Sequence, residues 1–413
     1  MTRALITGIG IVAPNGCGTE EYWTAALAGR TGIAPLPGKD YDTYPARLAG
    51  QVTGFDATAR VPPHLLQQTD RATQLALAAA EDALADAGAE PARLPEYDLG
   101  VVTANAAGGF AFTHREIRKL WTQGPEFVSV YESFAWFYAV NTGQISIRHG
   151  LRGPGAVLVS EQAGGLDALG QCRRVLRGGT GLVLGGGLDS ALDPWAWVSQ
   201  WASGRLSDST DPATAYLPFD PRARGYVPGE GGAVLVLENE EFAQARGARA
   251  HGEIRGYAAT FDPRPGSGRP PGLERAIRLA VADAGLDPGE IDAVFADCAG
   301  IPDADAAEAR ALAAVFGPYG VPVAAPKALV GRLYSGGPPL DVATALLSLR
   351  DHVLPPCGTR LRPDPRHQLD LVTGVPRHTR LRHCLVLARG AGGFNAAVVV
   401  SGAAPTTTGG TAP

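Results

Sequence analysis

The chain has 413 residues, a formal net charge of −5 at pH 7 and a hydrophobic content of 45%. This hydrophobic fraction excludes wholesale disorder, and the slight acidity argues against a general nucleic-acid-binding protein. The five cysteines have none of the short spacings that mark a zinc site or a disulfide framework. No apolar run is long enough to span a membrane, and no leader with a basic start and a cleavage signal precedes the first apolar segment. A cytoplasmic protein without a cofactor is therefore expected.

The first predicted elements are a buried strand over residues 4–12, a tight turn at residues 14–16 and a helix over about residues 20–28. A longer helix is predicted from residue 69 to residue 87, with Gly88 in the position that ends many helices. Helices that alternate with apolar strands in this way indicate an α/β fold with mainly parallel sheets covered by helices.

The same series of features occurs twice along the chain. Ala-Asp-Ala-Gly at residues 85–88 precedes a proline loop and a strand-like segment at residues 99–103. The same four residues at 282–285 precede a proline loop and a strand-like segment at residues 291–295. Because a helix of similar length comes before each copy, the sequence predicts two similar α/β halves.

The predicted halves are residues 1–250 and residues 251–402. Residues 403–413 consist of Ala, Pro, Thr and Gly, with no large apolar side chain, and are predicted to be a disordered tail.

A sharp turn between a strand and a helix is predicted around Gln162. An apolar strand ends at Ser160 and a helix begins at about Ala163, with Gly164 and Gly165 after the turn. Such a turn places one side chain at a helix N-terminus, where the helix dipole lowers the pKa of a thiol or stabilises an oxyanion. A nucleophilic enzyme would carry Cys or Ser there, whereas glutamine cannot attack a carbonyl. An ordinary turn remains open as an interpretation of this segment alone.

Four segments carry a family resemblance: residues 131–145, 159–165, 218–225 and 229–232. Together they resemble the β-ketoacyl synthases of the thiolase-like superfamily, and more narrowly the chain length factors, which are the ketosynthase beta subunits of bacterial type II aromatic polyketide synthases. The resemblance covers about residues 3–402 and includes the glutamine at the turn, a hallmark of that subunit. It implies a duplicated thiolase-like fold, layered α-β-α-β-α, with two mixed, mainly parallel sheets.

The resemblance also implies that all three catalytic groups of a condensing ketosynthase, one Cys and two His, are replaced. Gln162 stands at the Cys position, Asp297 at the first His position and Arg332 at the second. Lys327, which precedes the second His in the family, is kept, and Ala391 takes the place of the gating Phe. These positions are therefore expected to be vestiges without catalytic function.

Two further expectations concern the surroundings of these positions. Lys327 is expected to pair with Glu308 or Asp297 as a structural remnant. Cys172 and Cys298 are expected to be packed side chains without a chemical role, because neither lies at the turn.

A pocket and an interface are also implied by the resemblance. Phe110, Thr113 and Ile117 recur at spacings that share one helical face, which would line the pocket of the growing polyketide, and Trp195 would close its base. A dense aromatic run suits an interface with a ketosynthase alpha subunit: Tyr131, Phe134, Trp136, Phe137 and Tyr138. An ordinary monomer core is the alternative for both sets.

Three functions compete at this point. The favoured one is a non-condensing chain length factor in a heterodimeric acyltransferase complex, whose chain is carried on an acyl carrier protein. The second is a malonyl-acyl carrier protein decarboxylase that primes chain initiation, which the loss of both His weighs against. The third is a binding protein that keeps the fold as a scaffold. No nucleic-acid, membrane or metal partner is expected.

Overall fold

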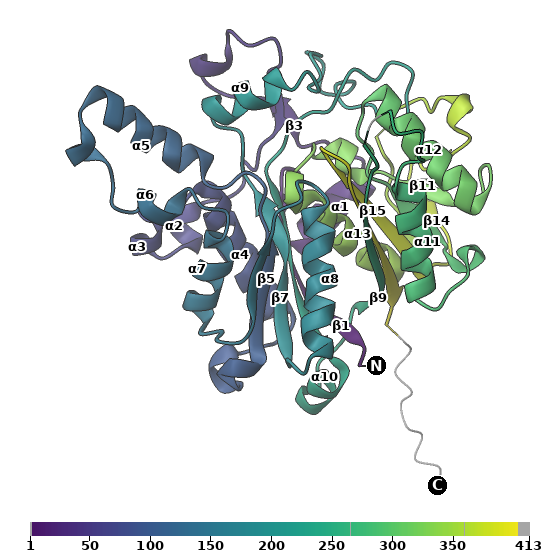
Figure 1. The fold of residues 1–413 in the computed structure, drawn as a ribbon, viewed down its shortest axis with the longest axis horizontal. Coiled ribbons are helices and arrows are strands. Elements are labelled where there is room, and N and C mark those ends of the chain that lie inside the picture. Colours follow the sequence, from purple (N-terminus) through teal and green to yellow (C-terminus); the bar gives the residue numbers. More distant parts are fainter. Residues whose placement is uncertain (1, 265, 359, 404–413) are drawn as a thin grey trace.

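The structure is a computed structural model that describes residues 2–264, 266–358 and 360–403 (Figure 1). Its N-terminal half contains a sheet whose neighbouring strands, in order, are β1 (Ala4–Ala13), β8 (Gly231–Asn239), β7 (Leu182–Asp189), β5 (Leu99–Ala104) and β6 (Gly155–Leu158). The C-terminal half repeats this order with β9 (Gly252–Phe261), β16 (Phe394–Gly402), β15 (His383–Gly390), β10 (Ala293–Phe295), β11 (Pro322–Ala324) and β13 (Asp370–Leu371).

Strand direction follows the same rule in both halves. In each half, the first three strands pair with their neighbours in antiparallel fashion. From the third strand onward, each strand is parallel to the next. The two sheets meet where β1 pairs with β9 over only two residue pairs, Leu5 with Glu253 and Ile6 with Gly252. The predicted mixed sheets are therefore present, with parallel pairing confined to the outer strands and hydrogen bonds joining the sheets at this seam.

Helices cover and separate the sheets in five layers, as the resemblance implied (Figure 1). On the outer face of the first half, α4 (Arg71–Asp86) contacts β1 and β8, and on that of the second half, α11 (Leu273–Asp283) contacts β9 and β16. Between the sheets, α8 (Gly164–Arg177) and α13 (Gly337–Asp351) contact strands of both halves. The duplicated α/β fold is thus confirmed.

The predicted repeat has a close structural counterpart. Gly88 and Gly285 follow α4 and α11 with φ of 57° and 64°, a left-handed conformation that favours glycine. Asp86, in the last turn of α4, accepts a hydrogen bond from the N–H of Ile9 on β1 at 2.8 Å. Asp283 accepts one from the N–H of Tyr257 on β9 at 2.9 Å. The two helices are therefore attached to their sheets in the same way.

The remaining elements connect or extend these layers. The helices are α1 (Thr19–Leu27), α2 (Ala57–Arg60), α3 (Pro63–Leu66), α5 (Phe110–Thr122), α6 (Glu132–Ala135), α7 (Val140–His149), α9 (Pro194–Ala202), α10 (Glu240–Arg246) and α12 (Pro302–Phe316). The short strands are β2 (Gly16–Cys17), β3 (Ile33–Pro35), β4 (Leu48–Gly50), β12 (Val353–Leu354) and β14 (Arg377–His378). The division of the chain at residue 250 falls between α10 and β9 and stays a prediction. The tail predicted over 403–413 lies outside the described residues from 404 onward.

Two features of the N-terminal half bear on the sites described below. Helix α5 projects from the body as an arm (Figure 1), and α6 follows it on the way back. Strand β6 ends the strand order, and within the described part of the chain only β5 pairs with it.

Among the described helices, none combines the length and the apolar character that crossing a membrane requires.

Candidate functional site

The predicted turn lies where β6 leads into α8. Glu161 adopts a φ of 52°, which is uncommon for a residue with a side chain, and α8 begins at Gly164. A Cβ at Gly165 would lie 2.3 Å from the carbonyl oxygen of Ser335, so glycine lets α8 approach the turn before α13. The Gln162 side chain at this turn is only 1% exposed, so it faces the interior of the fold.

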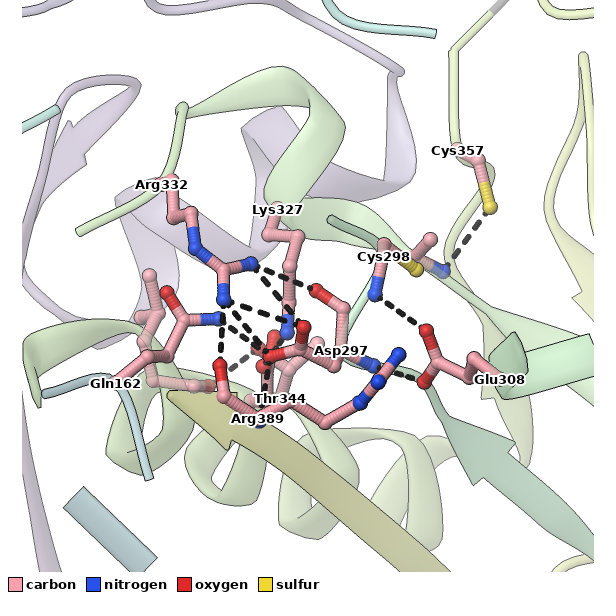
Figure 2. Close-up of polar contacts among 12 residues, drawn as sticks. Gln162, Asp297, Cys298, Glu308, Lys327, Arg332, Thr344, Cys357 and Arg389 are labelled. Atoms are coloured by element: carbon pink, nitrogen blue, oxygen red, sulfur yellow. Dashed lines mark hydrogen bonds and ion pairs between the residues drawn. The ribbon is translucent and has the colours of Figure 1, made fainter. Parts of the chain in front are cut away.

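Asp297, at the end of β10, is the centre of the contacts around Gln162 (Figure 2). Its Oδ1 accepts hydrogen bonds from Nε2 of Gln162 at 2.8 Å and from the N–H of Arg389 at 2.9 Å. Both terminal nitrogens of Arg332 lie 3.2 Å from its Oδ2. Burial alone would raise the pKa of Asp297, but the positive charges of Arg332 and Lys327 outweigh it and hold the pKa below its usual range.

Arg332 is buried and has a second anchor. It donates a hydrogen bond to the carbonyl oxygen of Arg389 at 2.7 Å, and its guanidinium lies over the ring of Tyr226 at 5.7 Å. The three residues at the vestigial positions, Gln162, Asp297 and Arg332, therefore form one connected polar cluster, which we call the Asp297 cluster.

Lys327 does not pair with Glu308 or Asp297 as expected. Its Nζ lies 2.6 Å from Oδ2 of Asp341 on α13, in a buried ion pair. Glu308 is occupied elsewhere, because its two oxygens accept the N–H groups of Asp297 at 2.6 Å and of Cys298 at 3.0 Å. The partner predicted for Lys327 is therefore wrong.

The cysteines near the site are buried thiols. Cys172 and Cys298 have no exposed surface, and burial raises the pKa of each thiol well above its usual value. Since the thiolate is the reactive form, neither side chain is suited to be a nucleophile.

A cavity of about 310 Å³ borders the Asp297 cluster. Asp297 and Arg332 are part of its lining, together with the loop of residues 390–393. The loop is attached to the turn, because the N–H of Ala391 donates to Oε2 of Glu161 at 2.6 Å. The carboxylate of Asp297, which accepts the hydrogen bond from the Gln162 amide, thus also faces this cavity.

The residues expected to form the pocket lie on α5 and α9. Phe110, Thr113 and Ile117 are half-buried on α5. The rings of Phe110 and Trp195 are 5.3 Å apart in an edge-to-face contact, and Trp195 on α9 remains 42% exposed. The structure therefore brings Trp195, the predicted base of the pocket, against Phe110, one of the residues predicted to line it.

The aromatic run after α5 is not an ordinary core. Trp136 is 49% exposed and Phe137 is also exposed, while Tyr131, Phe134 and Tyr138 are half-buried. Sequence reasoning missed four further exposed apolar side chains on the same arm: Leu120, Trp121, Phe127 and Val130. Large apolar residues within the polar stretch of residues 115–132 were the available signal.

Comparisons with known proteins agree on one family. Residues 1–243 match the family described as Beta-ketoacyl synthase, N-terminal domain, and residues 251–359 match Beta-ketoacyl synthase, C-terminal domain. A Streptomyces coelicolor protein assigned as the actinorhodin polyketide beta-ketoacyl synthase 2 is 63% identical over 403 residues, which are 97% of this chain and 99% of that protein.

A second relative and a solved structure are also similar over nearly their whole length. The tetracenomycin polyketide synthase ketoacyl synthase beta subunit of Streptomyces glaucescens is 59% identical over 398 residues, 96% of this chain and 97% of that protein. The structure of the ishigamide ketosynthase/chain length factor has a TM-score of 0.87 at 28% identity, covering 98% of this chain and 100% of that chain.

Proposed function

Because the chain belongs to the beta-ketoacyl synthase family, among the ketosynthase beta subunits of type II polyketide synthases, we propose that it is a chain length factor. In this role it does not condense acyl units itself. It pairs with a ketosynthase alpha subunit and limits the length of the poly-β-ketone built from malonyl units on an acyl carrier protein.

The observation that carries this proposal is the Asp297 cluster. An amide at residue 162 cannot attack a thioester, and its N–H is bound to Asp297. The lowered pKa of Asp297 keeps that carboxylate ionised, and a guanidinium does not lose its proton in proteins. Neither side chain can replace an imidazole that gains and loses a proton near neutral pH. The strand-to-helix turn at Gln162 is therefore suited to stabilising the fold rather than to catalysing condensation.

The face of α5 that carries Phe110, Thr113 and Ile117 is the proposed limit on chain length. Each two-carbon unit added to the polyketide needs space, and a side chain at the end of the pocket makes the next unit clash. Forcing extra methylenes into a filled site costs about 1–3 kcal/mol, which slows an elongation step about tenfold or more. Shape alone can thus set product length without any chemistry in this subunit.

The exposed arm supports a partner subunit at this end of the molecule. The apolar side chains of Trp121, Val130 and Trp136 are between 49% and 80% exposed, which is unusual for a protein that stays monomeric. Among the described residues only β5 pairs with β6, which lies in the same N-terminal half, so the other side of β6 offers backbone groups for pairing. Large aromatic residues are also enriched at protein interfaces.

The test is product length in the reconstituted complex of alpha subunit, this chain and acyl carrier protein. Phe110→Ala, Thr113→Ala and Ile117→Ala are expected to enlarge the pocket and to shift the products, measured by mass spectrometry, toward longer chains. Arg118→Ala on the exposed side of the same helix is the matched control and should leave product length unchanged. Unchanged length in all three pocket variants would overturn the pocket assignment, and a stable homodimer that ignores the alpha subunit would overturn the pairing.

A further inference from the structure

One carboxylate joins the two helices that carry Phe110 and Trp195. Oδ1 of Asp193 accepts the N–H of Trp195 at 2.9 Å and so caps the N-terminus of α9. Nδ1 of His114 on α5 lies 2.8 Å from Oδ1 and 3.0 Å from Oδ2 of the same carboxylate. Because an ionised carboxylate only accepts, Nδ1 must carry the hydrogen and donate it. His114 thus bridges α5 to the cap of α9.

Both ends of this bridge are fixed to the body of the fold. The loop before α9 is held by the hydroxyl of Tyr41, which donates to the carbonyl oxygen of Leu192 at 2.6 Å. The first turn of α5 is held by Asp70, which caps α4 through the N–H of Ala72 at 2.9 Å and also accepts the N–H of Phe112 at 2.8 Å. The bridge therefore connects two anchored backbones rather than two free helices.

The anchored backbones leave the ring of Trp195 as the exposed part of this contact. That side chain is 42% exposed, and its ring contacts Phe110 at 5.3 Å and His114 at 6.5 Å. A side chain at the base of the pocket limits product length only if it keeps its position when the growing polyketide reaches it. A free indole can rotate out of the way, whereas an indole held between two rings forces the chain to overpack.

From this geometry we propose that His114 is a positioning residue that sets the depth of the pocket by holding Trp195 against Phe110 through Asp193. The proposal rests on the proposed function as a chain length factor and adds a polar residue on the same side of α5 as the side chains that are proposed to line the pocket. His114 touches no reacting atom, and its effect is on where elongation stops.

The experiment compares His114→Ala, His114→Asn and Trp195→Ala in the complex with alpha subunit and acyl carrier protein. We expect His114→Ala to raise the ratio of longer to shorter products by on the order of three- to tenfold, where tenfold corresponds to about 1.4 kcal/mol. Asn keeps a donor near the position of Nδ1, so His114→Asn should retain most of the wild-type ratio. His378→Ala, an exposed histidine on β14 in the other half, is the matched control.

A double variant separates positioning from a general loss of structure. If His114 acts through Trp195, adding His114→Ala to Trp195→Ala changes the product ratio no further. Additive effects, or an unchanged ratio in His114→Ala while Trp195→Ala alters it, would overturn the role of His114 and leave the chain-length function intact. If Trp195→Ala itself leaves product length unchanged, the pocket assignment fails and this inference fails with it. Co-purification with the alpha subunit checks that each variant still forms the complex.

Discussion

The Asp297 cluster and the pocket face of α5 are built in opposite ways within one chain. In the cluster, the carboxylate of Asp297 is buried and has Gln162, Arg332 and the backbone of Arg389 as partners. On α5, the side chains of Phe110, Thr113 and Ile117 are half-buried, and the ring of Trp195 beside them is 42% exposed. The charged groups of the first region are paired with one another within this chain, whereas the second region leaves apolar surface for another molecule to cover.

This difference separates stability from function. Removing a partner from the closed cluster should destabilise the fold, while changing the open face should alter the product and leave the fold almost unchanged.

The largest expected effect is on folding. Asp297→Ala leaves the buried guanidinium of Arg332 without its counter-charge and should lower the free energy of unfolding by about 3–5 kcal/mol, measured by chemical denaturation. Asp303→Ala, an exposed acid on α12, is the control and should change it by less than about 0.5 kcal/mol. A loss of less than about 1 kcal/mol in Asp297→Ala would show that the cluster does not hold the fold.

The next effect is on product length. Ile117→Phe adds volume to the half-buried face of α5 and should shorten the product, with the ratio of longer to shorter chains falling about tenfold. The free energy of unfolding should change by less than about 1 kcal/mol, because this face is not enclosed. Arg118→Phe adds the same ring on the exposed side of the helix and should leave the products unchanged. Longer chains from Ile117→Phe would contradict the role of this face.

A smaller effect concerns pH and the carboxylate of Asp305 on α12. Burial raises its pKa to about 7, against the opposing hydrogen bond from the N–H of Phe219. An unfolded carboxyl titrates near about 3.9, so the folded state holds this proton more tightly. The stability that Asp305 contributes is therefore present at low pH and lost as the pH rises from about 4 to 7.

Asp305→Asn removes this titration. The variant should lose less stability than the wild type between pH 4.5 and 7.5, measured as the difference in unfolding midpoint at roughly those two values. Asp303→Asn, two residues earlier and exposed, should follow the wild-type curve. Parallel curves for Asp305→Asn and the wild type would mean that Asp305 does not titrate in this range.

The smallest expected effect is on condensation activity after a substitution at Gln162, in the turn before α8. Gln162→Cys should not restore condensation when the alpha subunit lacks its own nucleophile, because Asp297 and Arg332 stand where imidazoles are needed. The thiol should also resist alkylation in the native chain, since residue 162 is 1% exposed, and react after denaturation, as peptide mapping would report. Product formation above background would show that the site is less closed than the contacts indicate.

The sequence predicted the fold where local signals and the global arrangement agree. The repeated Gly88 and Gly285 mark helix ends that require a positive φ, and the glycines after Gln162 mark a close approach of two helices. The partner of Lys327 could not be predicted, because Asp341 lies in a helix whose described residues are almost all buried. The contact between His114 and Asp193 joins residues 79 positions apart, and no periodic pattern encodes such a pair.

Strand β6 has a consequence for how a cell makes this protein. Within the described part of the chain one side of β6 has no partner strand, and such a side is a template for further pairing. Copies produced in excess of the proposed partner would expose this side to one another. Synthesis of the two subunits in equal amounts would keep that side covered soon after folding. Expression of this chain alone is therefore expected to give aggregated protein, and co-expression with the alpha subunit to give soluble protein.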